Sequence, residues 1–165
     1  MDELLEQIES SLENNEFYLA LFVSLTIPDI CGALGSKNGQ AKGNRYKAWF
    51  DKYVSHNYRG NLDGSNCYAF RCATLHQGRT KHKNLGYSRI LFADPAASGI
   101  LMHNNVLNDA LNIDIQHFCQ DIIKGVRAWL KDMEDDENFK NHYPHFLKRH
   151  KGGLAPYIKG IDVFS

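Results

Sequence analysis

The most apolar stretch of the chain is residues 17–34, which read FYLALFVSLTIPDICGAL. Apolar residues occur on nearly every side of a helix drawn through it, which is typical of a helix at the centre of a core. Pro28 predicts a kink or a break there, because proline lacks the amide N–H and clashes with the preceding turn. The longest apolar run, residues 17–27, is about half of a membrane span. We therefore expect a core helix and no membrane association.

Helical periodicity continues on both sides of this stretch. Apolar residues repeat on one face of residues 2–12, and aromatic residues repeat on one face of residues 44–55. Further helices are predicted over 65–77, with Ser65 as N-cap and Gly78 as the C-terminal stop, and from Asp114 to about residue 130. A short helix is expected within 138–148. Residues 87–93 and 100–103 predict a β-hairpin around Asp94-Pro95.

The length and composition indicate one folded domain. The chain has 165 residues, of which 43% are hydrophobic, and these values exclude a disordered chain. Its four cysteines include no Cys-x-x-Cys pair, which disfavours a zinc or redox motif and favours the reducing cytoplasm. The acidic amino terminus is unlike a signal peptide. We expect a mainly α fold, with one domain over residues 1–150 and a C-terminal tail over 151–165.

Charge is distributed unevenly although the net charge is zero. Residues 1–29 carry seven acids and no Lys or Arg, residues 30–93 carry eleven bases and two acids, and residues 94–165 carry eight bases and ten acids. A basic middle third that faces solvent would attract phosphate groups. Alternatively, the acidic amino terminus folds against the basic block and neutralises it.

The helix predicted over 65–77 carries two functional candidates, Arg71 and His76, among small and apolar residues. An unpaired arginine is costly to bury, so Arg71 should reach solvent or a partner. His76 lies in the last turn, where the helix dipole favours a protonated imidazole that can donate a proton. The planar guanidinium of Arg71 suits a phosphate. The pair could therefore cleave RNA without a metal.

Spacing alone leaves this hypothesis open. Residues five apart lie about 140° apart around a helix, so Arg71 and His76 of one helix are not expected to converge tightly. Two such helices at a two-fold axis would place two arginines and two histidines around one phosphate. The alternative is a structural protein in which Arg71 and His76 are buried and satisfied inside the chain.

The segment Arg71-Cys72-Ala73-Thr74-Leu75-His76 resembles the R-x4–6-H motif of the HEPN superfamily, and residues 68–78 resemble the helix that carries it. The outline of the resemblance covers about residues 1–130. It implies a HEPN-like bundle of four to five main helices, with the 87–104 hairpin as an insertion. It also implies a homodimeric, metal-independent endoribonuclease, of the kind found in toxin–antitoxin and antiviral defence systems. Arg71 and His76 would be the catalytic pair, with no metal and no cofactor.

Other residues are expected to support this site. Asp29 could orient His76 or pair with Arg71, or act only as a local cap, and Tyr68 could stack on a base or belong to the core. Cys72 follows the motif arginine, where the family often has Asn, Asp or His, and a thiol is a poor hydrogen-bond donor. The resemblance therefore also implies an alternative, a non-catalytic HEPN-like module that binds a nucleotide or a partner protein such as an antitoxin. A basic segment after the helix could follow an RNA backbone or be merely solvated; it comprises Arg79, Lys81, His82 and Lys83.

Overall fold

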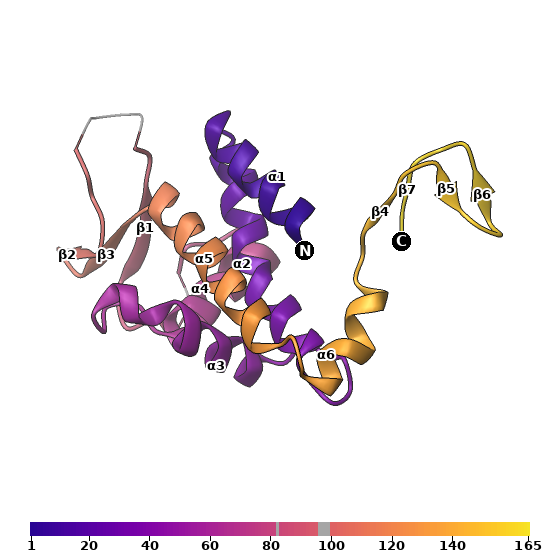
Figure 1. Cartoon of the computed structure of the whole chain (residues 1–165). Helices are drawn as coiled ribbons and strands as arrows, with labels where there is room; N and C mark the ends of the chain where they lie inside the picture. Colours follow the sequence, from indigo (N-terminus) through magenta and orange to yellow (C-terminus); the bar gives the residue numbers. More distant parts are fainter. Residues whose placement is uncertain (82, 96–99) are drawn as a thin grey trace.

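The computed structural model describes residues 1–81, 83–95 and 100–165. Within these residues the chain is mainly helical, as the sequence predicts, and six α-helices are formed (Figure 1). The helices are α1 (Asp2–Glu13), α2 (Phe17–Leu34), α3 (Gly43–Tyr53), α4 (Gly64–Gln77), α5 (Ile115–Asp132) and α6 (Glu137–His142). Short 3-10 turns lie at Ser55–Tyr58 and Tyr143–His145.

Helix α2 is central, because it contacts α1, α3, α4 and α5. Pro28 lies inside α2 without ending it, and Leu25 and Ile27 beside it are fully buried. The apolar amino-terminal half of α2 is not covered on all sides, since Tyr18 is 80% exposed and Leu19 is 58% exposed. By length and composition α2 could cross a membrane, but core helices of globular proteins pass the same test, and 44% of this helix is buried in the fold.

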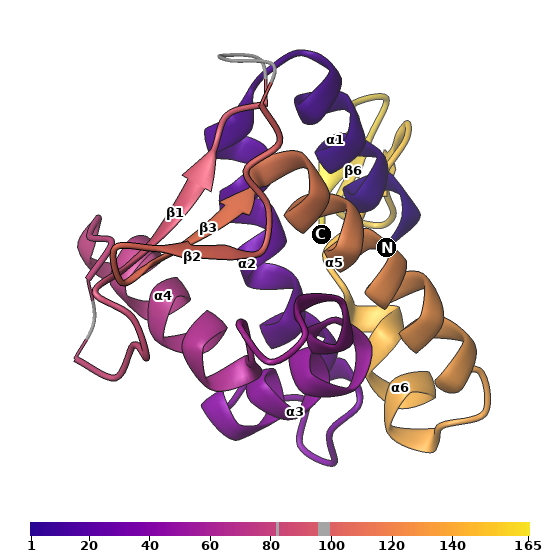
Figure 2. The ribbon, with the colours of Figure 1, turned by 90° about the vertical axis from the view of Figure 1, so that its left-hand side faces the viewer.

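The hairpin predicted around Asp94-Pro95 is wrong. Strand β1 (Arg89–Ala93) pairs in parallel with β3 (Ala110–Asp114), which pairs antiparallel with β2 (Asn105–Leu107), giving the order β1-β3-β2 (Figure 2). The tight turn is instead Asn108-Asp109, where both residues have positive φ, as a type I′ hairpin requires. Residues 100–103 form no strand, and residues 96–99 lie outside the described part of the chain.

The carboxyl terminus is more ordered than the predicted tail. Strand β4 (Arg149–His150) pairs with β7 (Val163–Phe164), and β5 (Gly153–Leu154) pairs with β6 (Ile158–Lys159). The paired segment thus begins before residue 151, the boundary expected from the sequence. Residues 147–165, here called the C-terminal arm, project from the helical body (Figure 1). The helix expected over 138–148 is shorter and ends at His142.

Candidate functional site

Helix α4 carries the predicted site and is fixed at both ends by local hydrogen bonds. The Asn66 amide donates to the carboxylate of Asp63 at 2.7 Å, so Asp63 is the N-cap and the prediction of Ser65 is wrong. Gly78 adopts the left-handed conformation, with φ of 60°, as predicted for the C-terminal stop. The Gly78 and Arg79 amides donate to the carbonyls of Thr74 and Ala73, which closes the helix directly after His76.

Arg71 brings residues from two helices together. One terminal nitrogen, Nη2, lies 2.6 Å from Oδ2 of Asp29 on α2, and the other, Nη1, lies 2.6 Å from Nε2 of His76. The expectation that Arg71 and His76 of one helix do not converge is therefore wrong, because the long arginine side chain spans the angle between them. Of the three roles expected for Asp29, the structure shows the ion pair with Arg71. The side chains of Arg71 and Asp29 are only 17% and 14% exposed.

The contact with Arg71 determines the hydrogen-bonding role of His76. A guanidinium has donors and no acceptor, so Nε2 of His76 must accept the hydrogen bond. In this arrangement the imidazole is neutral, with its proton on Nδ1, in contrast to the protonated ring that the helix dipole favours. The ring itself is exposed. His76 is thus presented to solvent as a proton acceptor whose lone pair is held by Arg71.

Burial changes the ionisation of the groups around Arg71. It raises the pKa of Asp29, although the Arg71 guanidinium and His76 act in the opposite direction. Burial also raises the pKa of Tyr68, and the contact with the Cys72 thiol one turn later adds to this. The Tyr68 ring packs 5.2 Å from the ring of Tyr46, measured between centroids. Tyr68 and half-buried Cys72 therefore border the Arg71 cluster, and Tyr68 also forms part of the core surface.

The predicted basic segment follows His76 directly. Arg79, Lys81 and Lys83 are exposed, and the structure gives them no ion pair with a described residue, whereas His82 lies outside the described part. The loop leaves the end of α4 and returns to its first turn, where the Gly86 amide donates to Asn66 Oδ1 at 2.6 Å. Three cationic side chains thus lie on a loop that spans the same helix as Arg71 and His76.

The structure agrees in part with each alternative drawn from the sequence, an exposed catalytic or binding pair and a buried structural pair. Arg71 and His76 contact each other, as a purely structural role requires. His76 is nevertheless exposed, and Nε of Arg71 is buried with no hydrogen-bond partner among the described residues. The pair is therefore not fully satisfied inside the chain.

A second polar cluster has no motif in the sequence. The rings of His103 and His117 lie 4.9 Å apart, and Nδ1 of His117 lies 2.8 Å from Oδ1 of Asp114, the N-cap of α5. Burial lowers the pKa of His103, and the adjacent His117 lowers it further. The three-residue spacing of Asp114 and His117 is the feature of the sequence that could have indicated this cluster. In the described ranges no group of three His, Cys, Asp or Glu side chains is arranged to hold a metal ion.

Comparison with known proteins adds no assignment. No protein-family model, no curated protein and no solved structure matches the chain.

Proposed function

We propose that the chain is a metal-independent endoribonuclease of the HEPN type. The observation that carries the proposal is the cluster on α4, in which the largely buried Arg71 holds the exposed His76 beside a basic loop. Arg71 and Lys81 supply fixed positive charge for a phosphodiester, and His76 supplies the group that moves a proton. The R-x4-H spacing adds the resemblance to a family in which this pair is catalytic.

The chemistry follows from the proton positions. The neutral Nε2 of His76 takes the proton of the ribose 2′-hydroxyl as the 2′-oxygen attacks phosphorus. The bond from phosphorus to the 5′-oxygen breaks, and that oxygen takes up a proton. The products are a 2′,3′-cyclic phosphate and a free 5′-hydroxyl, so DNA, which lacks the 2′-hydroxyl, is not cleaved. Arg71 turns its fork toward the phosphate and thereby frees Nε2 of His76.

The reaction moves two protons, and each chain offers one imidazole at this site. We therefore propose a homodimer in which α4 lies at or beside the two-fold axis, so that His76 of the second copy protonates the 5′-oxygen. We also propose a cytoplasmic toxin or antiviral effector, because four free cysteines suit a reducing compartment and an RNA-cleaving enzyme needs restraint, as by an antitoxin partner.

Two observations favour the second candidate, a binding module without turnover. Cys72 stands directly after Arg71, where a stronger hydrogen-bond donor would help to hold a phosphate. Asp29 lies 2.6 Å from Arg71 and partly neutralises its charge. In that case the same surface binds a nucleotide or a partner protein and does not cleave RNA.

The test is cleavage of end-labelled RNA in the presence of EDTA. We expect His76→Ala to lower the cleavage rate by about 10²–10⁴ and Arg71→Ala to lower it by about 10²–10³. Arg71→Lys should fail as well, because an ammonium cannot form the bidentate fork. His56→Ala is a matched control, since His56 is exposed on the Ser55–Tyr58 turn.

The outcomes separate the two candidates. Full activity in His76→Ala, or cleavage of single-stranded DNA, would contradict the mechanism. Binding of RNA without cleavage in the wild-type protein would favour the binding module. Products that lack a 2′,3′-cyclic phosphate would exclude attack by the 2′-hydroxyl.

A further inference from the structure

The C-terminal arm is a narrow ribbon that is held away from the body. Lys148 and Ser165 exchange backbone hydrogen bonds of 3.0 and 3.1 Å, and Arg149 forms an ion pair of 2.7 Å with Asp162. These contacts fix the base of the arm, and the β5–β6 pair forms its far end (Figure 1). The arm therefore has a defined shape although it rests on few parts of the domain.

Large apolar side chains of the arm face solvent. Tyr157 is 84% exposed, Ile161 is 60% exposed and Phe164 is 69% exposed. A two-stranded ribbon has no second layer in which to bury such residues and is at best marginally stable alone in water. Large apolar side chains exposed together on one segment are typical of interaction sites in soluble proteins.

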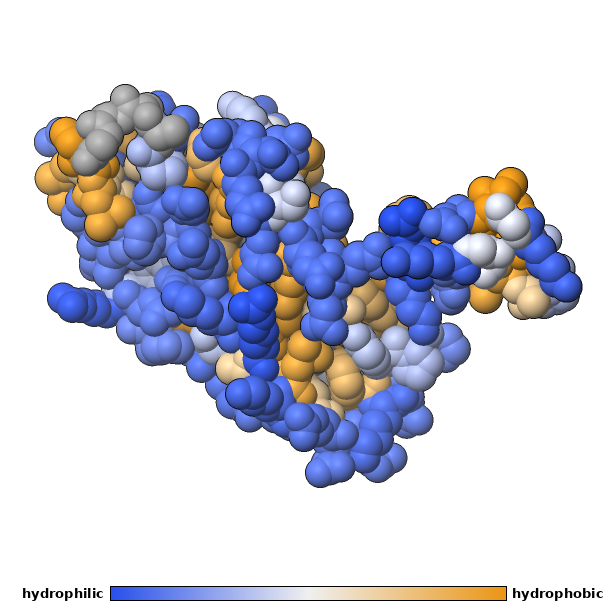
Figure 3. All heavy atoms as spheres, turned by 45° about the horizontal axis from the view of Figure 1, so that its top comes forward, coloured by the Kyte–Doolittle hydropathy of each residue, from blue (hydrophilic) through white to orange (hydrophobic). Residues whose placement is uncertain are grey.

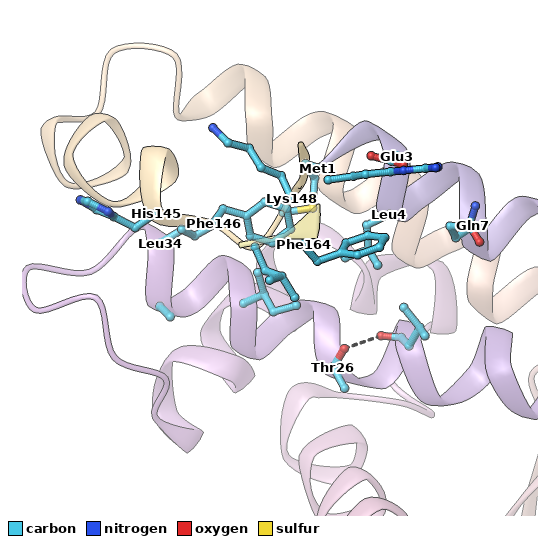
Figure 4. A pocket seen from close by; sticks show the side chains of 15 residues that line it. Met1, Glu3, Leu4, Gln7, Thr26, Leu34, His145, Phe146, Lys148 and Phe164 are labelled. Atoms are coloured by element: carbon cyan, nitrogen blue, oxygen red, sulfur yellow. Dashed lines mark hydrogen bonds between the residues drawn. The ribbon is translucent and has the colours of Figure 1, made fainter. Parts of the chain in front are cut away.

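An apolar groove lies beside the base of the arm. It has a volume of about 830 Å³ and runs between α1, α2 and the first and last residues of the arm (Figure 4). Apolar side chains form most of its wall, among them Leu4, Val23, Ile30, Leu34 and Phe146. The space-filling view shows apolar atoms in a band between polar surfaces of the body, and more of them on the arm (Figure 3).

The arm and the α1 side of the groove have opposite charge. Residues 2–13 contain five acidic and no basic residues, whereas residues 147–165 contain four basic and one acidic residue. Glu3 and Glu6 on α1 are exposed, as are Lys151 and Lys159 on the arm, and none of the four has an ion pair within the described residues. One chain thus carries both halves of a complementary contact.

The arm cannot fill the groove of its own chain unless the contacts at the base of the arm break. Phe146 and Phe164 already form one wall of that groove. To fold back over it, the far end of the arm would have to break the β4–β7 pair and the Arg149–Asp162 ion pair that direct it outward. A second copy meets no such restriction.

We propose that two copies of this chain associate by reciprocal docking, with the arm of each copy in the α1–α2 groove of the other. Tyr157 and Ile161 enter the groove, and Lys151 and Lys159 face Glu3 and Glu6. A stable interface buries about 1,200 Å² in total, so each arm and each groove must contribute about 300 Å², which two or three large side chains supply.

This contact is separate from the one proposed for the catalytic site. Helix α4 and the arm lie on different sides of the body in both ribbon views (Figures 1 and 2). A chain that uses both contacts forms a closed tetramer when the two two-fold axes cross at right angles, and one that uses only the arm forms a dimer. In either case loss of arm docking halves the mass of the assembly, and this result does not depend on RNA cleavage.

The test is a charge exchange, followed by light scattering at micromolar concentration. The arm variant Lys151→Glu/Lys159→Glu and the helix variant Glu3→Lys/Glu6→Lys should each weaken association about tenfold or more and halve the mass. The chain that carries all four changes should regain the wild-type mass. Lys37→Glu/Lys131→Glu is the control for a change of net charge, and it should behave as the wild type.

Further outcomes decide the proposal. The variant Ile161→Asp should halve the mass even at high salt, because its effect does not depend on surface charge. Circular dichroism should show the same helical content in all variants, since the changed side chains are exposed. A monomeric wild-type protein, arm variants of unchanged mass, or failure of the fourfold variant to recover would each overturn arm docking.

Discussion

Removal of Arg71 tests whether the site also holds the fold together. Arg71 joins α4 to Asp29 on α2 through an ion pair of 2.6 Å, and both side chains are largely buried. In the variant Arg71→Ala, Asp29 remains in the same place without its counterion. An activity loss in this variant can therefore be interpreted only when the stability change is known.

The cost can be bracketed from the exposure of the pair. Exposed ion pairs contribute about 0–1 kcal/mol, and breaking a fully buried pair costs about 3–5 kcal/mol. Arg71 and Asp29 are 17% and 14% exposed, so an intermediate cost of about 2–3 kcal/mol is expected. For a chain of this length that corresponds to a fall in Tm of about 4–12 °C.

The assay is urea unfolding of four proteins: wild type, Arg71→Ala, Asp29→Asn and the double variant. Most of the cost of Arg71→Ala should disappear when Asp29 is already Asn, giving a coupling free energy of about 2 kcal/mol. Additive single effects would refute the reasoning, because they would show that the pair contributes no interaction energy.

The same cycle has a defined pH dependence. Burial raises the pKa of Asp29 in the native state, so the native state binds this proton more tightly than the unfolded state does. The contribution of Asp29 to stability is therefore present at low pH and is lost as pH rises through the native pKa. Without Arg71 the carboxylate is still less favourable, so Arg71→Ala should cost more at about pH 7.5 than at about pH 5.

Three further predictions concern other parts of the molecule. Gly64→Ala should destabilise the fold by about 1–3 kcal/mol in urea unfolding, because a Cβ there would lie 2.7 Å from the Cα of Lys47. Ser65→Ala should be nearly neutral in the same assay, since Ser65 is not the N-cap. Burial lowers the pKa of His103, so the unfolded state binds a proton on this imidazole more tightly than the native state does. Stability should therefore fall as pH drops below about 6.5, and His103→Gln should remove part of that fall. RNA affinity should decrease steeply with salt concentration. Charge reversal at Lys81 and Lys83 should reduce the slope of log affinity against log salt by about two, one for each phosphate that the loop no longer neutralises. An unchanged slope would exclude the loop as an RNA-binding segment.

Local sequence was sufficient for the helices and for the position of the candidate site. Periodicity located α1 to α5 within a few residues, because an amphipathic or fully apolar helix leaves its pattern in consecutive residues. Capping preferences also placed Gly78 at the end of α4 and Asp114 at the start of α5, since a cap forms hydrogen bonds with residues of the adjacent turn. The N-cap of α4 was placed two residues too late, because Asp63 and Ser65 are both good caps and the local sequence does not distinguish them.

Contacts between distant segments were decided by tertiary structure. The parallel pairing of β1 with β3 joins strands separated by residues 94–109, and no local turn signal specifies such a pairing. Asp29 and Arg71 are separated by more than forty residues, so their ion pair depends on how α2 packs against α4. The sequence by itself determined the helices, the motif and the uneven charge, because these depend on neighbours along the chain. Only the tertiary structure decided that Arg71 holds both Asp29 and His76, and that a basic arm with exposed apolar side chains projects beside an apolar groove. These arrangements depend on where side chains of distant segments meet.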